Sequence, residues 1–434
     1  MDTKNLSLYD SPAYKRSRMA YKLECTFEYF VALLVGDAFL ANLLTHVGFS
    51  DAEAGIISSF ITLAFLFQLI SVFVVRKITN TKLVAILFHA ASQLFFMSLY
   101  LTPFLPFAKD IKKPLVIICI LAAYFGNYLV STLIYRWGNS YVEPTKRASF
   151  TAGKEIIALV AGMVVSFAIG YVMDAFTESG NVEGGFIFAA VAIFVFCLCD
   201  FITLMLIKND VKPKEKRAES VPMSEVIKNT LGNKNFLNVV VLMILWDVSR
   251  YIVVGFMGTY KNSLYALGAI QIINIVGHLA RAILSKPLAK YTEKRTFAKG
   301  IELGLIITAT AMLANIFTTP DTRFLVIVYT ILYNVSMACM NGNIVNITYS
   351  YVDSRYFAEA SAIKNSIAGL FGFGASLLGG WILDLVQTNQ DKIAEVVGFT
   401  IYGQQVLSVI SLVLLIITIL FTHFVVAKQK VMIQ

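Results

Sequence analysis

Long apolar runs separated by short polar stretches dominate the hydropathy pattern of the chain. Twelve runs are long enough to cross a bilayer, which takes about 20 residues of helix. Because the runs are continuous and do not alternate, they indicate helices and not the strands of a membrane barrel. We expect an all-α polytopic membrane protein with spans at 21–44, 53–75, 83–103, 114–139, 149–173, 185–207, 236–259, 264–285, 299–318, 323–349, 358–386 and 396–427.

Composition narrows the class of protein further. Of 434 residues, 57% are hydrophobic and only 15% are charged, against about 25% charged in an ordinary soluble domain. The short loops leave no room for a large soluble domain, so a soluble enzyme and a nucleic-acid-binding protein are excluded. The net charge of +9 fits basic residues that flank membrane spans. No small-residue cleavage site follows the first apolar run, so we expect no removable signal peptide.

The distribution of basic residues predicts the orientation. If both termini and the basic stretch 208–235 are cytoplasmic, only six of the 36 Lys and Arg residues lie outside: Lys109, Lys112, Lys113, Lys261, Arg323 and Lys392. Cytoplasmic loops carry an excess of Lys and Arg. We therefore expect a multi-pass protein of a cell membrane with both termini in the cytoplasm, and the short loops and tails favour a bacterial membrane.

Two parts of the chain match each other without gaps at an offset of 210 residues. Residues 140–174 read SYVEPTKRASFTAGKEIIALVAGMVVSFAIGYVMD, and residues 350–384 read SYVDSRYFAEASAIKNSIAGLFGFGASLLGGWILD. Two unrelated apolar helices would rarely share charged residues and glycines in the same places. The match predicts two parallel six-helix halves, at 1–207 and 236–434, joined by a cytoplasmic linker at 208–235. Pairs at this offset include Lys154/Lys364, Gly162/Gly372, Asp174/Asp384 and Asp37/Asp247.

Two parallel six-helix halves joined by a basic loop resemble the major facilitator superfamily, over nearly the whole chain. The signature of acid and bases after the second span is degenerate here: Arg76 and Lys77 lack an acid, whereas Glu293, Lys294 and Arg295 keep one. The resemblance implies a transporter that works by alternating access, with its substrate site near the midplane between the halves.

By that resemblance, spans 1, 4, 7 and 10 should line the substrate path. Polar side chains recur every three or four residues along the fourth span, and part of this stripe returns in the tenth. These groups either line the cavity or join helices through hydrogen bonds. The candidates are Tyr124, Asn127, Ser131, Tyr135 and Asn139, with Asn334 and Asn341 in the second copy.

Charged residues inside spans mark candidate binding or coupling residues, because they are costly in lipid and face protein or water. Asp247 and Arg250 are three residues apart and can meet on one helix face, either as a functional pair or as a static bridge. With its repeat mate Asp37, Asp247 is a candidate proton carrier. The other candidates are Trp246 and Tyr251 in the seventh span, and Gln271, Asn274, His278 and Arg281 in the eighth. For His278, a hydrogen-bonded packing role is the alternative.

Charges near the cytoplasmic ends of spans suggest gate contacts. We assign the gate and motif loops to Arg76, Lys77, Lys154, Glu293, Lys294, Arg295 and Lys364. Glu24 lies at the cytoplasmic start of the first span, where we expect a gate or interface salt bridge, and Asp200 lies toward the inner boundary of the sixth span. No cysteine or histidine spacing suggests a metal site, and the four scattered histidines argue against an embedded enzyme.

The predicted function is secondary active transport of a small polar solute, with a sugar or glycoside preferred. No phosphate-binding loop is present, so the energy must come from a gradient of H⁺, Na⁺ or solute, without a cofactor. The expected partners are the solute and the lipid bilayer, with no nucleic acid, and the protein is expected to be a monomer. The alternatives are a multidrug-type efflux transporter and a non-transporting sensor or lipid-handling protein.

Overall fold

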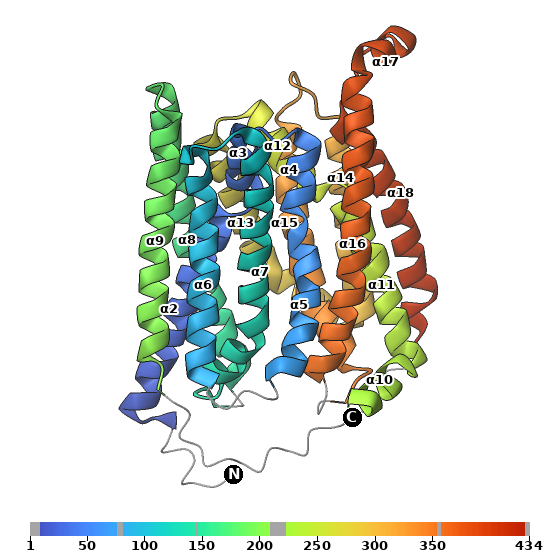
Figure 1. The fold of residues 1–434 in the computed structure, drawn as a ribbon. Helices are drawn as coiled ribbons and strands as arrows, with labels where there is room; N and C mark the ends of the chain where they lie inside the picture. Colours follow the sequence, from blue (N-terminus) through green and yellow to red (C-terminus); the bar gives the residue numbers. More distant parts are fainter. Residues whose placement is uncertain (1–8, 76–80, 144–145, 209–222, 354–356, 430–434) are drawn as a thin grey trace. The chain divides into compact units, whose positions relative to one another are not determined.

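The computed structural model describes residues 9–75, 81–143, 146–208, 223–353 and 357–429, and these contain helices but no strands (Figure 1). Eleven helices in this part of the chain are long and apolar enough to cross a membrane. The number is twelve if the bent pair Pro12–Leu34 and Asp37–Val47 forms one span. The predicted all-α polytopic architecture is therefore confirmed.

The contacts between residues divide the chain into two compact units. The first comprises Met1–Gly48 and Ile70–Glu219. In it, α9 packs against both α2 and α6, α8 packs against α2 and α9, and α6 packs against α7. Its helices are α2 (Pro12–Leu34), α3 (Asp37–Val47), α6 (Thr81–Leu101), α7 (Lys109–Asn139), α8 (Arg147–Glu178) and α9 (Val182–Leu206).

The second unit comprises Phe49–Leu69 and Ser220–Gln434. Helix α11 lies against α16 and α18, while α15 lies against α13 and α14. Besides α4 (Asp51–Ser58) and most of α5 (Phe60–Val75), the unit contains α10 (Met223–Leu231), α11 (Lys234–Tyr251), α12 (Met257–Leu264), α13 (Leu267–Glu293), α14 (Phe297–Ile316), α15 (Leu325–Tyr349), α16 (Phe357–Thr388), α17 (Gln390–Val397) and α18 (Gly403–Phe424).

Residues 49–69 belong to the second unit by their contacts, although the sequence predicts a first half of 1–207. Close packing at glycines joins residues 49–69 to the second unit. A Cβ added at Gly55 would lie 1.9 Å from the Phe256 ring, and one at Gly369 would lie 2.4 Å from the Thr62 carbonyl oxygen. Ser366 also donates to the Phe65 carbonyl at 2.7 Å. The six-helix halves remain a prediction from the repeat, and residues 209–222 of the linker lie outside the described residues.

The internal repeat is visible in the bounds of the helices. Helices α8 and α16 are both 32 residues long, and they begin at Arg147 and Phe357, which are 210 residues apart. Helices α7 and α15 end at Asn139 and Tyr349, which have the same separation. The helix bounds on either side of this loop therefore repeat at the same offset in the two copies.

The first span differs from the expected continuous helix over 21–44. It begins earlier, at Pro12, because Ser11 caps the helix by accepting from the Tyr14 N–H. It is then interrupted after Leu34, and the helices on either side are bent by 44°. The apolar pattern shows neither feature. Basic residues make the first turns of the helix polar, and only a single Gly36 marks the break.

Candidate functional site

Helix α11 carries the best-connected group of predicted site residues. The Asp247 side chain is buried, and its Oδ1 accepts from Nε and Nη2 of Arg250 at 3.1 and 2.9 Å. Because the two residues are one helical turn apart, both side chains lie on one face. A carboxylate and a guanidinium with two N–H···O contacts form a strong, oriented pair.

Aromatic rings enclose the guanidinium of this pair. The Arg250 carbon Cζ lies 4.3 Å from the ring centre of Tyr251 and 5.3 Å from that of Trp246. The Tyr251 hydroxyl accepts from Nη2 at 3.0 Å, and Tyr333 of α15 also hydrogen-bonds the guanidinium. The sequence reasoning missed Tyr333, because it lies one residue off the polar stripe of its span.

Lys364, assigned to the gate from the sequence, is buried inside the second unit. It is two turns into α16, is only 3% exposed, and donates to the Thr348 hydroxyl at 3.2 Å. Its charge acts on Asp247. The charges of two cations, Arg250 and Lys364, therefore act on the single carboxylate of Asp247, and the gate role of Lys364 stays a prediction.

The predicted stripe on α13 contacts its neighbours at several points. Gln271 is buried, and the Asn274 Oδ1 accepts from the buried Lys261 at 3.3 Å. Gly277 leaves room for Asn334, since a Cβ added at the glycine would lie 2.7 Å from the asparagine Nδ2. These contacts fit the helix-joining alternative. The remaining members of the two stripes are half-buried or exposed: His278, Arg281 and Asn341.

The stripe on α7 is divided between packing and accessible positions. Tyr124 is buried against Phe96, with ring centres 5.3 Å apart, and the Asn139 amide donates to the Tyr135 carbonyl. The Tyr135 side chain is 55% exposed. Asn127 has a buried Oδ1 without a hydrogen-bond partner among the described residues. Ser131 donates to a backbone carbonyl of its own helix.

Asp37 lies at the interruption of the first span. It is exposed, begins α3 and has a left-handed backbone with φ of 43°. A non-glycine residue in this region stores about 1–3 kcal/mol of strain, and such residues cluster at functional sites. Broken helices are also a feature of transporter binding sites. The left-handed backbone at the break therefore keeps Asp37 among the candidate site residues.

The other gate candidates make local contacts. Lys154 lies 4.9 Å from the ring centre of Tyr21, so it forms a cation–π contact. Arg295 does the same with Tyr291 at 5.0 Å. Glu293 and Lys294 are exposed. Arg76 and Lys77 lie outside the described residues.

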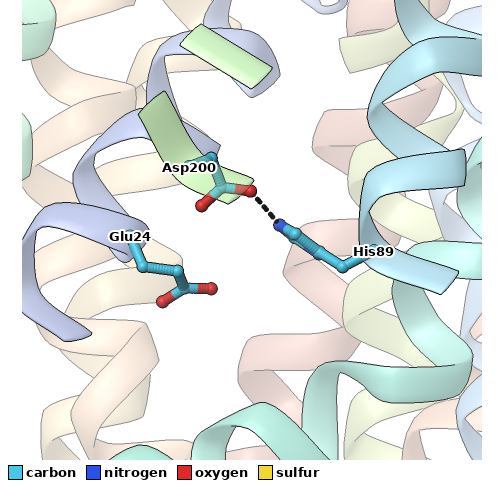
Figure 2. Close-up of side chains that lie close together, drawn as sticks. All are labelled: Glu24, His89 and Asp200. Atoms are coloured by element: carbon cyan, nitrogen blue, oxygen red, sulfur yellow. Dashed lines mark ion pairs between the residues drawn. The ribbon is translucent and has the colours of Figure 1, made fainter. Parts of the chain in front are cut away.

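A second polar cluster was not foreseen from the sequence. Glu24 of α2, His89 of α6 and Asp200 of α9 converge inside the first unit (Figure 2). Their exposed fractions are 0, 1 and 1%, and His89 Nε2 lies 2.7 Å from Asp200 Oδ2. Asp200, expected from the sequence only to lie toward the inner boundary of its span, has this buried histidine as its partner.

Comparison with known sequences identifies one family. The family model described as Major Facilitator Superfamily matches residues 29–376. No curated protein matches the chain.

Comparison with solved structures finds transporters of several kinds. The D-xylose-proton symporter has a TM-score of 0.71 at 15% identity, covering 96% of this chain and 100% of that one. The nucleoside transporter NupG has 0.69 at 11%, covering 97% and 100%. A bacterial homolog of the human lysosomal transporter Spinster, in an inward-facing and unoccupied conformation, has 0.69 at 14%, covering 96% and 98%. At these identities the likeness shows the fold alone.

Proposed function

Because the chain belongs to the Major Facilitator Superfamily and is a multi-pass membrane protein, we propose that it is a secondary active transporter of a small polar solute. Transport is by alternating access and is coupled to H⁺ or Na⁺. A sugar or glycoside is the preferred solute. The protein acts as a monomer in a bacterial cytoplasmic membrane, with both termini in the cytoplasm.

The observation that carries this proposal is the Asp247–Arg250 pair with its aromatic surroundings. Ionisable residues inside membrane spans are rare and mark substrate or ion pathways. Arg250 is held between Trp246 and Tyr251, and its side chain is 18% exposed. Aromatic faces beside fixed hydrogen-bond donors suit a hydroxyl-rich solute. A guanidinium beside the rings argues against cationic drugs, the substrates of the multidrug alternative.

Asp37 and Asp247 supply the proposed coupling groups. The two carboxylates occupy equivalent positions of the repeat, but their surroundings differ. Asp247 is buried and paired with Arg250, whereas Asp37 is exposed at a helix start. A coupling carboxylate must bind and release a cation during the cycle. When Asp247 releases the coupling cation, the neighbouring Arg250 guanidinium can take the place of that cation as counter-ion of the carboxylate.

The first experiment identifies the solute. The purified protein in mild detergent is heated with sugars, glycosides, nucleosides, peptides and cationic drugs, and its unfolding temperature is measured. A ligand at 100 times its dissociation constant should stabilise the folded state by about 2.7 kcal/mol. Solutes that bind are then tested for counterflow in proteoliposomes, which a sensor does not support.

The second experiment tests coupling with Asp247→Asn and the matched control Asp391→Asn, an exposed acid in the first turn of α17. We expect Asp247→Asn to abolish accumulation driven by a H⁺ or Na⁺ gradient while leaving solute exchange intact. The control should retain both. Unchanged accumulation in Asp247→Asn would refute the coupling role, and binding of drugs alone would favour the efflux alternative.

A further inference from the structure

The cluster of Glu24, His89 and Asp200 lies within the first unit, and none of its three members belongs to the residues assigned to solute binding or coupling. Each side chain comes from a different helix, and α9 packs directly against both α2 and α6. A histidine nitrogen and two carboxylate oxygens lie within 4.8 Å of one another. In Figure 2 the carboxylates and the imidazole point into one common space.

The hydrogen bonds of the described residues leave this cluster incomplete. The His89–Asp200 contact uses one atom of each side chain. Within the described part of the chain, the buried atoms Oε1 of Glu24, Oδ1 of Asp200 and Nδ1 of His89 have no hydrogen-bond partner. A buried polar group without a partner destabilises the folded state. A site with several such atoms in one place has the chemistry of a binding site lacking its ligand.

The charge of the cluster is also uncompensated. Among the described residues, no Lys or Arg forms an ion pair with Glu24 or Asp200, and the charge of Glu28 acts on all three members. When both buried carboxyls are ionised, a positive His89 balances only one of them. Buried charges are normally paired or coordinate metals, so a bound cation would balance the second.

We propose that Glu24, His89 and Asp200 bind a divalent transition-metal ion of the Zn²⁺ or Mn²⁺ class inside the first unit. One imidazole nitrogen with two carboxylate oxygens suits these ions, whereas Ca²⁺ and Mg²⁺ take oxygen ligands. A divalent ion neutralises both carboxylates. Bound there, it joins α2, α6 and α9.

The geometry requires only small side-chain movements. Ligands of a tetrahedral zinc lie about 2.0–2.2 Å from the ion, and therefore about 3.4 Å from one another. The 2.7 Å contact between His89 and Asp200 must open, and Glu24 must approach. Gln93, one turn along α6, supplies a fourth ligand. Its Nε2 is 3.4 Å from His89 Nε2, and its Oε1 has no hydrogen-bond partner among the described residues. Rotation of the side-chain amide exchanges the positions of Nε2 and Oε1.

The test measures metal binding directly and needs no solute, so it is independent of the proposed transport. Protein without a histidine tag is stripped with chelator, titrated with Zn²⁺ and with Mn²⁺, and its bound metal is counted after gel filtration. The variants are Glu24→Gln and Asp200→Asn. The Asp200→Asn side chain keeps an oxygen that accepts a hydrogen bond from His89, so this variant preserves the fold. Matched controls are His278→Gln and Asp110→Asn, which remove a histidine and an acid elsewhere.

We expect one equivalent of metal per chain and a higher unfolding temperature with metal in the wild type and both controls. Loss of even an outer-shell partner weakens metal sites by about 10–100-fold, so loss of a direct ligand should weaken binding by at least about 100-fold. Absence of saturable binding to the wild type would overturn the proposal. Equal binding by the wild type and the folded Glu24→Gln and Asp200→Asn variants would also overturn it, since the metal would then lie elsewhere.

Discussion

Replacing Asp247 by Asn is expected to destabilise the folded protein more than removing either of its cationic neighbours. The carboxylate is 1% exposed and lies 2.9 Å from Arg250 Nη2, with the charge of Lys364 also acting on it. The substitution leaves two cations in the protein interior without an anion. Breaking a buried pair by removing one partner costs about 3–5 kcal/mol, and we expect a loss in this range.

Arg250→Met and Lys364→Met should cost less, because each leaves Asp247 with one cation. Arg250→Met still loses two ring contacts, each worth about 0.5–2 kcal/mol, so we expect a loss of about 1–3 kcal/mol. Lys364→Met removes the cation that donates a hydrogen bond to the Thr348 hydroxyl. Its effect should be within about 1 kcal/mol of neutral, since exchanging buried charge for apolar volume is often tolerated.

The assay is equilibrium unfolding of the purified variants in mixed detergent, followed by helix content and tryptophan fluorescence. The double variant Asp247→Asn with Arg250→Met should be more stable than Asp247→Asn alone, since it removes one of the unpaired cations. Glu293→Gln, an exposed substitution, should stay within about 0.5 kcal/mol of the wild type. An Asp247→Asn variant as stable as the wild type, or a double variant showing simple additivity, would refute the charge argument.

Three further predictions concern the helices themselves. Gly369→Ala should destabilise the folded protein by about 1–3 kcal/mol through overpacking, because its Cβ would lie 2.4 Å from a carbonyl oxygen. The control Gly374→Ala, on the same helix, places its Cβ where nothing lies within 4 Å and should be neutral or stabilising in thermal unfolding. Asp37→Gly should raise stability by up to about 1 kcal/mol by relieving the positive φ, yet abolish gradient-driven uptake; lower stability would refute the strain assignment. Asn315→Ala should cost about 1–3 kcal/mol because it removes the buried 2.8 Å hydrogen bond to Ser408, and an unfolding temperature equal to the wild type would contradict this.

The positions of most spans could be predicted closely from the sequence. The fifth span, expected at 149–173, is α8 at Arg147–Glu178, and the tenth, expected at 323–349, is α15 at Leu325–Tyr349. The resemblance to the superfamily is also confirmed. Both predictions rest on patterns that a helix carries in its own residues: lipid demands about 20 apolar residues in a row, and a repeat preserves its spacing.

The Asp247–Arg250 contact was predictable for the same reason, because residues three apart meet on any helix. The environment of Lys364 was not. Its position at the start of the expected eleventh span suggested a gate, but α16 packs along α11 and turns this side chain inward. Whether a charged residue near a helix end faces water or protein depends on the neighbouring helix, which the local pattern does not contain.

Patterns within single segments of the sequence are enough to predict the class of protein: an all-α membrane transporter fold with an internal repeat and intramembrane charges at known positions. Which of those charges meet depends on how the helices pack. Glu24, His89 and Asp200 lie on three helices far apart in the chain and have no characteristic spacing, so no motif could reveal their convergence. The physical reason is that hydropathy and helical periodicity act within a segment, whereas pairing between segments depends on close packing, as at Gly55 and Gly369, where a missing side chain lets two backbones approach.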